Sequence, residues 1–115
     1  MKYQIPQSRL NLVIDKIVRS IYGEELKMFV QSDGYIFFHY GDYDVESKGF
    51  HKTYTPFHRN LGKNLWVGDL TLPKKISSLM SVSKEGSFDI LKNYFSTKYN
   101  IPVIYVSDES YEEWD

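Results

Sequence analysis

The strongest constraint on the fold of this chain is an apolar stripe at helical spacing near its N-terminus. At about 100° per residue, the apolar side chains of residues 8–22 fall within one arc of roughly 140°. They are Leu10, Val13, Ile14, Ile17, Val18 and Ile21. Pro6 suits the start of a helix here, and Gly23 stands where a left-handed C-terminal cap is expected. Such an amphipathic helix must bury its apolar arc against a second layer of secondary structure.

The segment after this helix predicts a β-hairpin. Residues 26–31 and 35–40 are rich in aromatic and branched side chains, and Asp33-Gly34 between them is typical of a tight turn with positive φ. The second strand is apolar on both faces, which is the pattern of a central strand covered on both sides. We therefore expect it to lie in the middle of a sheet.

Residues 41–63 show no sustained periodicity and predict a long loop. Loops of this length are unusual in small domains and are more often functional than idle. Residues 64–70 then alternate as a strand, with Leu65 and Val67 on one face and Trp66 on the other.

The C-terminal half predicts two helices and a closing strand. Pro73 suits the first turn of a helix that carries Ile76, residues 85–99 predict a second helix, and residues 101–106 predict a strand. Pro102 favours a strand start or a sheet edge. With one domain over residues 1–115, this order predicts an α+β fold. Its mainly antiparallel sheet has three to five strands, and the N-terminal helix and the two later helices pack on it.

We expect the apolar faces of these elements to pack together in one hydrophobic core. The side chains predicted to meet there are Leu10, Val13, Ile14, Ile17, Phe37, Trp66, Leu91 and Phe95.

The chain contains no cysteine, which excludes a disulfide framework, a thiolate zinc site and an iron–sulfur cluster. No apolar run reaches the length of a signal-peptide core at the N-terminus or of a membrane span elsewhere. The formal net charge is −1, so the whole molecule is not a polyanion binder. We expect a soluble, cytoplasmic protein.

Three histidines, His39, His51 and His58, are the residues to weigh as metal ligands or general bases. Their spacing matches no ligand motif, and His39 falls within the predicted central strand, where a hydrogen-bonded core histidine is expected. No phosphate loop, nucleophile elbow or Ser-x-x-Lys motif occurs. The sequence therefore predicts a protein that is not an enzyme, with no catalytic residue, no metal site and no cofactor.

A basic aromatic segment, residues 48–63, interleaves cations with rings. No acidic residue occurs between Ser47 and Gly68. Cations for phosphates and rings for base stacking are what a single-stranded nucleic-acid surface uses. The candidate nucleic-acid contacts are Lys48, Lys52, Arg59 and Lys63. The alternative is that these rings hold the loop against the core.

An acidic C-terminal segment, residues 107–115, has five carboxylates and no cation. Tyr111 and Trp114 beside Glu112 and Glu113 are typical of contacts to a basic partner surface. Docking of this segment onto the chain's own basic aromatic segment explains the same residues, and the sequence leaves both readings open.

These patterns favour a small binding protein that modulates or inhibits a larger macromolecular partner, most simply another protein. In kind, the chain is similar to phage-encoded host-modulating proteins and toxin immunity proteins. The residues predicted to contact the partner are Tyr54, Phe57, Arg59, Tyr111, Trp114, Glu112 and Glu113. A nucleic-acid-binding module is the alternative, and an enzyme ranks third.

Overall fold

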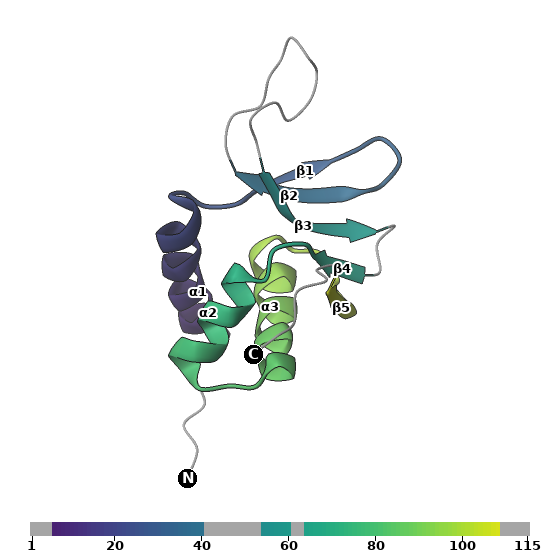
Figure 1. Ribbon diagram of the computed structural model, residues 1–115. Coiled ribbons are helices and arrows are strands. Elements are labelled where there is room, and N and C mark those ends of the chain that lie inside the picture. Colours follow the sequence, from purple (N-terminus) through teal and green to yellow (C-terminus); the bar gives the residue numbers. More distant parts are fainter. Residues whose placement is uncertain (1–5, 41–53, 61–63, 109–115) are drawn as a thin grey trace.

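The predicted N-terminal helix is present. The computed structural model of the chain describes residues 6–40, 54–60 and 64–108 (Figure 1). Helix α1 spans Gln7–Tyr22 and ends at Gly23, whose φ of 80° places it in the left-handed region that favours glycine. The Gly23 N–H donates to the Arg19 carbonyl oxygen, so the cap satisfies one of the last helical acceptors.

The predicted hairpin is also confirmed, with a wider turn than expected. Strands β1 (Lys27–Val30) and β2 (Ile36–Tyr40) pair antiparallel, and the Gln31 N–H donates to the Tyr35 carbonyl oxygen at 2.8 Å. Three residues therefore form the loop, and only Gly34 has positive φ (93°). This is the geometry of a type I turn followed by a left-handed residue, rather than the two-residue turn that Asp33-Gly34 suggests.

The prediction of a long loop over residues 41–63 is wrong for residues 54–60. Residues Tyr54–Asn60 form strand β3, which pairs antiparallel with β2 on one side and with β4 (Asn64–Val67) on the other. β3 is therefore the middle strand of the sheet. Its alternation of inward and outward residues is hidden in the sequence, because polar residues and a proline stand among its rings.

The remaining elements complete an α+β domain. Helix α2 (Thr71–Met80) has Pro73 in its first turn. Helix α3 (Lys84–Lys98) is capped at its N-terminus by Ser83, whose Oγ accepts from the Gly86 N–H. Strand β5 (Tyr105–Asp108) then pairs parallel with β4, which gives the sheet order β1-β2-β3-β4-β5. The sheet is antiparallel across its first four strands, and the helices lie together on one side of it (Figure 1).

The core lies between this helical layer and the sheet. Its centre is Phe95 of α3, whose ring lies 4.6 Å from that of Phe38 and 5.1 Å from that of Phe57, centroid to centroid. Tyr99 stacks on the same ring at 5.7 Å, and Tyr94 meets it edge-on. Side chains from every element except β1 and β5 complete the fully buried set, and β5 adds the partly buried Val106.

Three of the eight predicted core residues lie outside the core. Ile14, Ile17, Leu91 and Phe95 are buried and Leu10 packs against them, but Val13 is exposed at the border of the α1 stripe. Phe37 and Trp66 point to the opposite face of the sheet, since their neighbours in sequence point inward. β2 is an interior strand as expected, but it lies second in the sheet rather than in the middle, and the described helices cover only one of its faces (Figure 1).

A polar cluster joins α1 to α3. Asp15 Oδ1 accepts from the Tyr94 hydroxyl and from Lys98 Nζ, each at 2.7 Å, and Lys98 also lies 3.5 Å from a Glu25 carboxylate oxygen. Burial first, and then the hydrogen bond to Asp15, raise the pKa of the Tyr94 hydroxyl, so it remains a donor. The cluster sets the register between the two helices.

Replacement of Phe95 by alanine should lower the free energy of unfolding by about 3 to 5 kcal/mol, because it leaves a cavity where α3 meets two strands. Urea unfolding measures this change. The matched control is Leu12→Ala on the exposed side of α1, where the side chain is 61% exposed and the change should stay within about 0.5 kcal/mol. Similar decreases in stability for the two variants would contradict the assignment of Phe95 to the centre of the core.

Candidate functional site

The structure removes two residues from the predicted partner-binding set. The Phe57 ring is 0% exposed and packs on Phe95, so it serves the core. Arg59 is 6% exposed on the same, helix-facing side of β3, between its register partners Ile36 and Leu65. A side chain in that position is not available for a phosphate or a partner surface. Both corrections have one cause, which is that β3 is a central strand and not a loop.

The side chains of all the other predicted contacts lie outside the described residues. Tyr54 begins β3, and its side chain lies outside the described residues. Seven further predicted contacts lie wholly outside the described residues: Lys48, Lys52, Lys63, Tyr111, Glu112, Glu113 and Trp114. Their roles stay predictions.

A row of four rings crosses the face of the sheet opposite the helices. Phe29 of β1 is the register partner of Phe37 on β2, Phe37 is the partner of His58 on β3, and His58 is the partner of Trp66 on β4. Directly opposed residues share a face, so the four side chains form one line perpendicular to the strands. At about 4.8 Å between strands, this ring row is roughly 15 Å long.

Two ring contacts support the middle of the row. The rings of Phe37 and His58 lie 5.7 Å apart with an interplanar angle of 31°, and Tyr35 stacks on Phe37 at 6.4 Å. Phe29, Phe37, His58 and Trp66 are all partly accessible, and none of them belongs to the core cluster or packs against it. The ring row therefore offers aromatic surface that the hydrophobic core does not use.

His39 lies beside the ring row, on the same face of β2. Burial is the main cause that lowers the pKa of His39 below its ordinary value of 6.5, and the charge of Lys27, its register partner, adds to this effect. Glu24, which is 3.1 Å from Lys27 Nζ, acts in the opposite direction. His39 is consequently neutral at physiological pH and adds no charge to this face.

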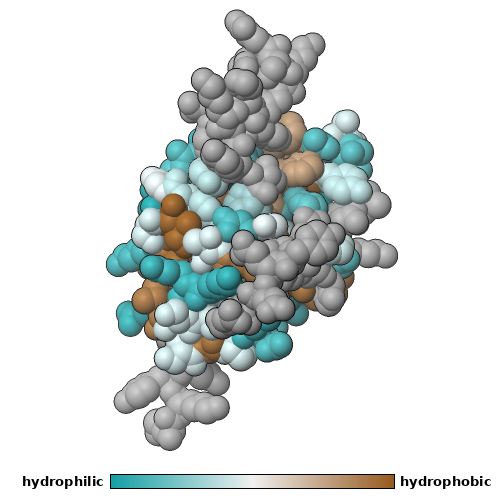
Figure 2. Space-filling model, in the orientation of Figure 1, coloured by the Kyte–Doolittle hydropathy of each residue, from teal (hydrophilic) through white to brown (hydrophobic). Residues whose placement is uncertain are grey.

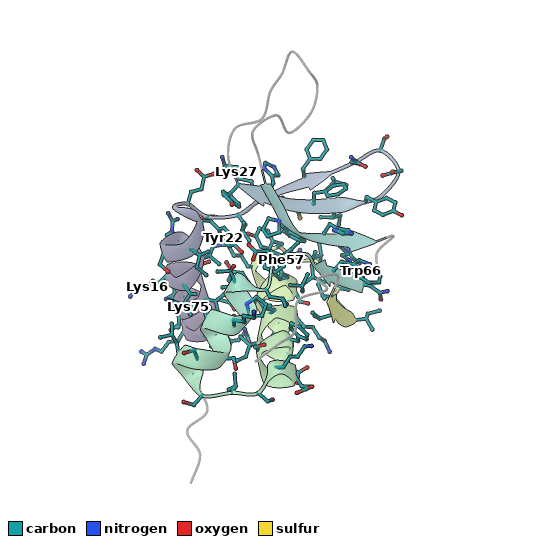
Figure 3. All side chains as sticks on the ribbon, in the orientation of Figure 1. Lys16, Tyr22, Lys27, Phe57, Trp66 and Lys75 are labelled. Carbon is teal, nitrogen blue, oxygen red and sulfur yellow. The ribbon has the colours of Figure 1, made fainter. Side chains whose placement is uncertain are left out.

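The helical side of the molecule carries a different surface. In Figure 2 the hydrophobic residues visible among the described ones form small patches separated by hydrophilic residues. Arg9, Lys16 and Arg19 are exposed on α1, and Arg19 forms an ion pair with Glu25 at 3.0 Å. Figure 3 shows Lys16 on the outer side of α1, at the opposite side of the view from Trp66. This basic flank is charged rather than aromatic.

One shallow cavity lies between α3 and the chain that leads into β5. It measures about 220 Å³ and is lined by Phe88, Ile104 and Val106, with Glu85, Asp89 and Lys92 at its polar part. Ligand pockets for small molecules usually exceed about 300 Å³. The cavity is therefore a poorer candidate for a functional site than the ring row.

Within residues 6–40, 54–60 and 64–108, no group of three or more histidine and carboxylate side chains is placed to hold a metal ion. No helix in these ranges is both long enough and apolar enough to cross a membrane. Comparison of the chain with protein-family models, with curated proteins and with solved structures finds no match.

Sequence reasoning missed the ring row, although part of the signal is present. The alternation of residues 64–70 places Trp66 opposite Leu65 and Val67, and that pattern alone argues that Trp66 faces away from the core. What the sequence lacks is the register, since His58 stands beside Phe37 and Trp66 only after β3 is recognised as a strand.

Acidification should weaken the fold through His39. The unfolded chain binds a proton at this residue with the ordinary pKa of 6.5, whereas the folded chain resists it, so the free energy of unfolding decreases as the pH falls below 6.5. Above that value the contribution is fully present. Urea unfolding of the wild type and of His39→Gln between about pH 7.5 and about pH 5 measures this effect.

The difference in stability between these two proteins isolates His39 from the carboxylates, which titrate in both. As the pH falls, the free energy of unfolding should decrease more for the wild type than for His39→Gln. An NMR titration should place the His39 midpoint below 6.5. A difference that is constant with pH, together with a midpoint at or above 6.5, would refute the effect.

Proposed function

We propose that this protein is a small, non-catalytic binding protein that engages a larger macromolecular partner through the ring row of Phe29, Phe37, His58 and Trp66. The observation that supports this proposal is the row itself, four rings in register on a sheet face that the core does not use. Large side chains left accessible in one continuous surface are typical of interaction sites. Aromatic residues also dominate binding energy where they are covered by a partner.

A protein is the partner that this surface favours. Among the described residues, few charged side chains lie around the ring row. Lys27 forms an ion pair with Glu24, and His39 is neutral. A nearly uncharged aromatic surface with a polar border suits the centre of a protein interface. A modulator or inhibitor of the phage or immunity type, acting in the cytoplasm, is the role we propose for a domain of this size.

The acidic C-terminal segment remains part of the proposal as a second contact. Tyr111 and Trp114, with Glu112 and Glu113, would add rings and negative charge suited to a basic region of the partner. This part rests on the sequence alone.

Single-stranded nucleic acid is the second candidate, and the ring row also supports it. Bases stack on accessible rings of a sheet in several RNA-binding modules. In the sequence, Lys48 and Lys52 precede β3 and Lys63 follows it, so cations occur on both sides of the strand that carries His58. Because Arg59 is buried, these three lysines are the phosphate-binding residues that remain in the nucleic-acid proposal.

Replacement of Trp66 by alanine should weaken the complex with the natural partner by about 2 kcal/mol, because a ring covered at an interface is typical of a hot spot. Capture from the source cell, with half of each sample treated with nuclease, followed by titration of the captured partner, measures this decrease in affinity. Trp66→Phe should retain most of the affinity. Leu12→Ala on α1 is the matched control and should bind as the wild type does.

Circular dichroism and urea unfolding show whether each variant remains folded. A partner that survives nuclease, is absent with Trp66→Ala and is kept by Leu12→Ala supports the protein reading. Binding that nuclease abolishes supports the nucleic-acid reading. In that case a Lys52→Ala, Lys63→Ala double variant should reduce the salt dependence by about one unit of slope for each phosphate that is no longer neutralised. Unchanged binding by folded Trp66→Ala and Phe37→Ala variants would move the interface away from the ring row, first to the basic flank of α1.

A further inference from the structure

Strand β1 is an apolar sheet edge with little protection. It lies at the end of the strand order and, among the described strands, pairs with β2 alone. Figure 1 shows the β1 and β2 hairpin extending beyond the helical layer. The Met28 side chain is 40% exposed and that of Val30 is 56% exposed. Proteins usually protect such edges with proline, a bulge or several charges, whereas this strand has only Lys27 at one end.

The free backbone groups of this edge can be assigned to particular residues. The bond from the Gln31 N–H to the Tyr35 carbonyl oxygen makes residues 31 and 35 a hydrogen-bonded pair. Such pairs alternate along an antiparallel ladder, so Phe29 and Phe37 form the next one. The backbone N–H and C=O groups of Met28 and Val30 therefore point away from β2. The two exposed apolar residues of β1 therefore also have the outward-facing backbone.

We infer that β1 pairs antiparallel with β1 of a second copy of this chain, about a two-fold axis at Phe29, to form a continuous ten-stranded sheet. Outward-facing backbone groups on a short edge select an extended strand as their occupant. A two-fold axis makes each strand the complement of the other. This inference does not depend on the proposed function.

The register follows from matching the outward-facing residues. With the axis at Phe29, Met28 of each copy stands opposite Val30 of the other, and both outward-facing residues of each strand meet hydrogen-bonded partners. A register centred on Met28 would pair Val30 with Leu26, which lies before the strand begins. The chosen register also places Lys27 opposite Gln31, so the two lysines do not oppose each other.

The same register matches the side chains on both faces of the sheet. Met28 and Val30 cover one another on the helix-facing side, which removes their exposed apolar surface from water. On the other face the two Phe29 rings meet at the axis. The ring rows of the two copies then join into a single row of eight rings across both sheets. No residue of the core changes its environment, because β1 contributes none to it.

Light scattering after size exclusion, and sedimentation velocity, test the inference on the full chain from low to high micromolar concentration. The mass should rise with concentration from 13.6 kDa toward twice that value. Val30→Pro removes an N–H that β2 does not use, so the fold should persist. Dimerisation should weaken by at least about thirtyfold, since each symmetric interface loses two donors.

Val30→Thr keeps the N–H and the branched shape and is the matched control, which should still dimerise. If Val30→Pro does not fold, as judged by circular dichroism, Val30→Lys keeps the test decisive, because it adds a charge to the edge at an exposed position. A wild type that stays monomeric at every concentration overturns the inference and leaves the edge to an extended segment of another protein. A dimer that persists unchanged in a folded Val30→Pro or Val30→Lys variant overturns it as well.

Discussion

The fold is organised around the contact of the Phe95 ring with two neighbouring strands. Phe95 lies on α3, and its ring meets Phe38 on β2 and Phe57 on β3 at 4.6 and 5.1 Å. One helix is therefore fixed against the middle of the sheet. α1 and α2 take their places by packing on α3 and on each other, and the outer strands take theirs by hydrogen bonding to β2 and β3.

This packing also determines which residues face away from the helices. Once Phe57 turns inward to meet Phe95, the pleat of β3 turns His58 outward and Arg59 inward. The antiparallel register then brings His58 beside Phe37 and Trp66, and Phe37 beside Phe29. The ring row is thus a geometric consequence of the core. A surface formed in this way has the rigidity of the sheet, which reduces the entropy cost of ordering it against a partner.

The two ends of the sheet differ because the helices cover it unevenly. At one end, α3 contacts β5, and Val106 packs against the core. At the other end, β1 contributes no core residue and its hairpin extends past the helices (Figure 1). Burial of β1 would require a further helix or a further strand. The described chain offers neither, so the apolar side chains of this edge stay in contact with solvent or with a second molecule.

The elements with local signals could be predicted from the amino-acid sequence. The 3.6-residue period predicted α1, and Gly23 marked its end. Asp33-Gly34 predicted the hairpin, and hydrophobic periodicity predicted the two later helices. The α+β class could be predicted from these elements. The role of residues 54–60 follows from tertiary contacts instead, because a proline and polar residues obscure their alternation and their strand partners are distant in sequence. Because these residues form β3, Phe57 and Arg59 are buried. Phe37 and Trp66 lie outside the core, and the ring row forms on the opposite face of the sheet. A local pattern shows which residues of one element share an apolar face. The register between strands is fixed by long-range packing, and this register determines which side chains from different strands form one surface.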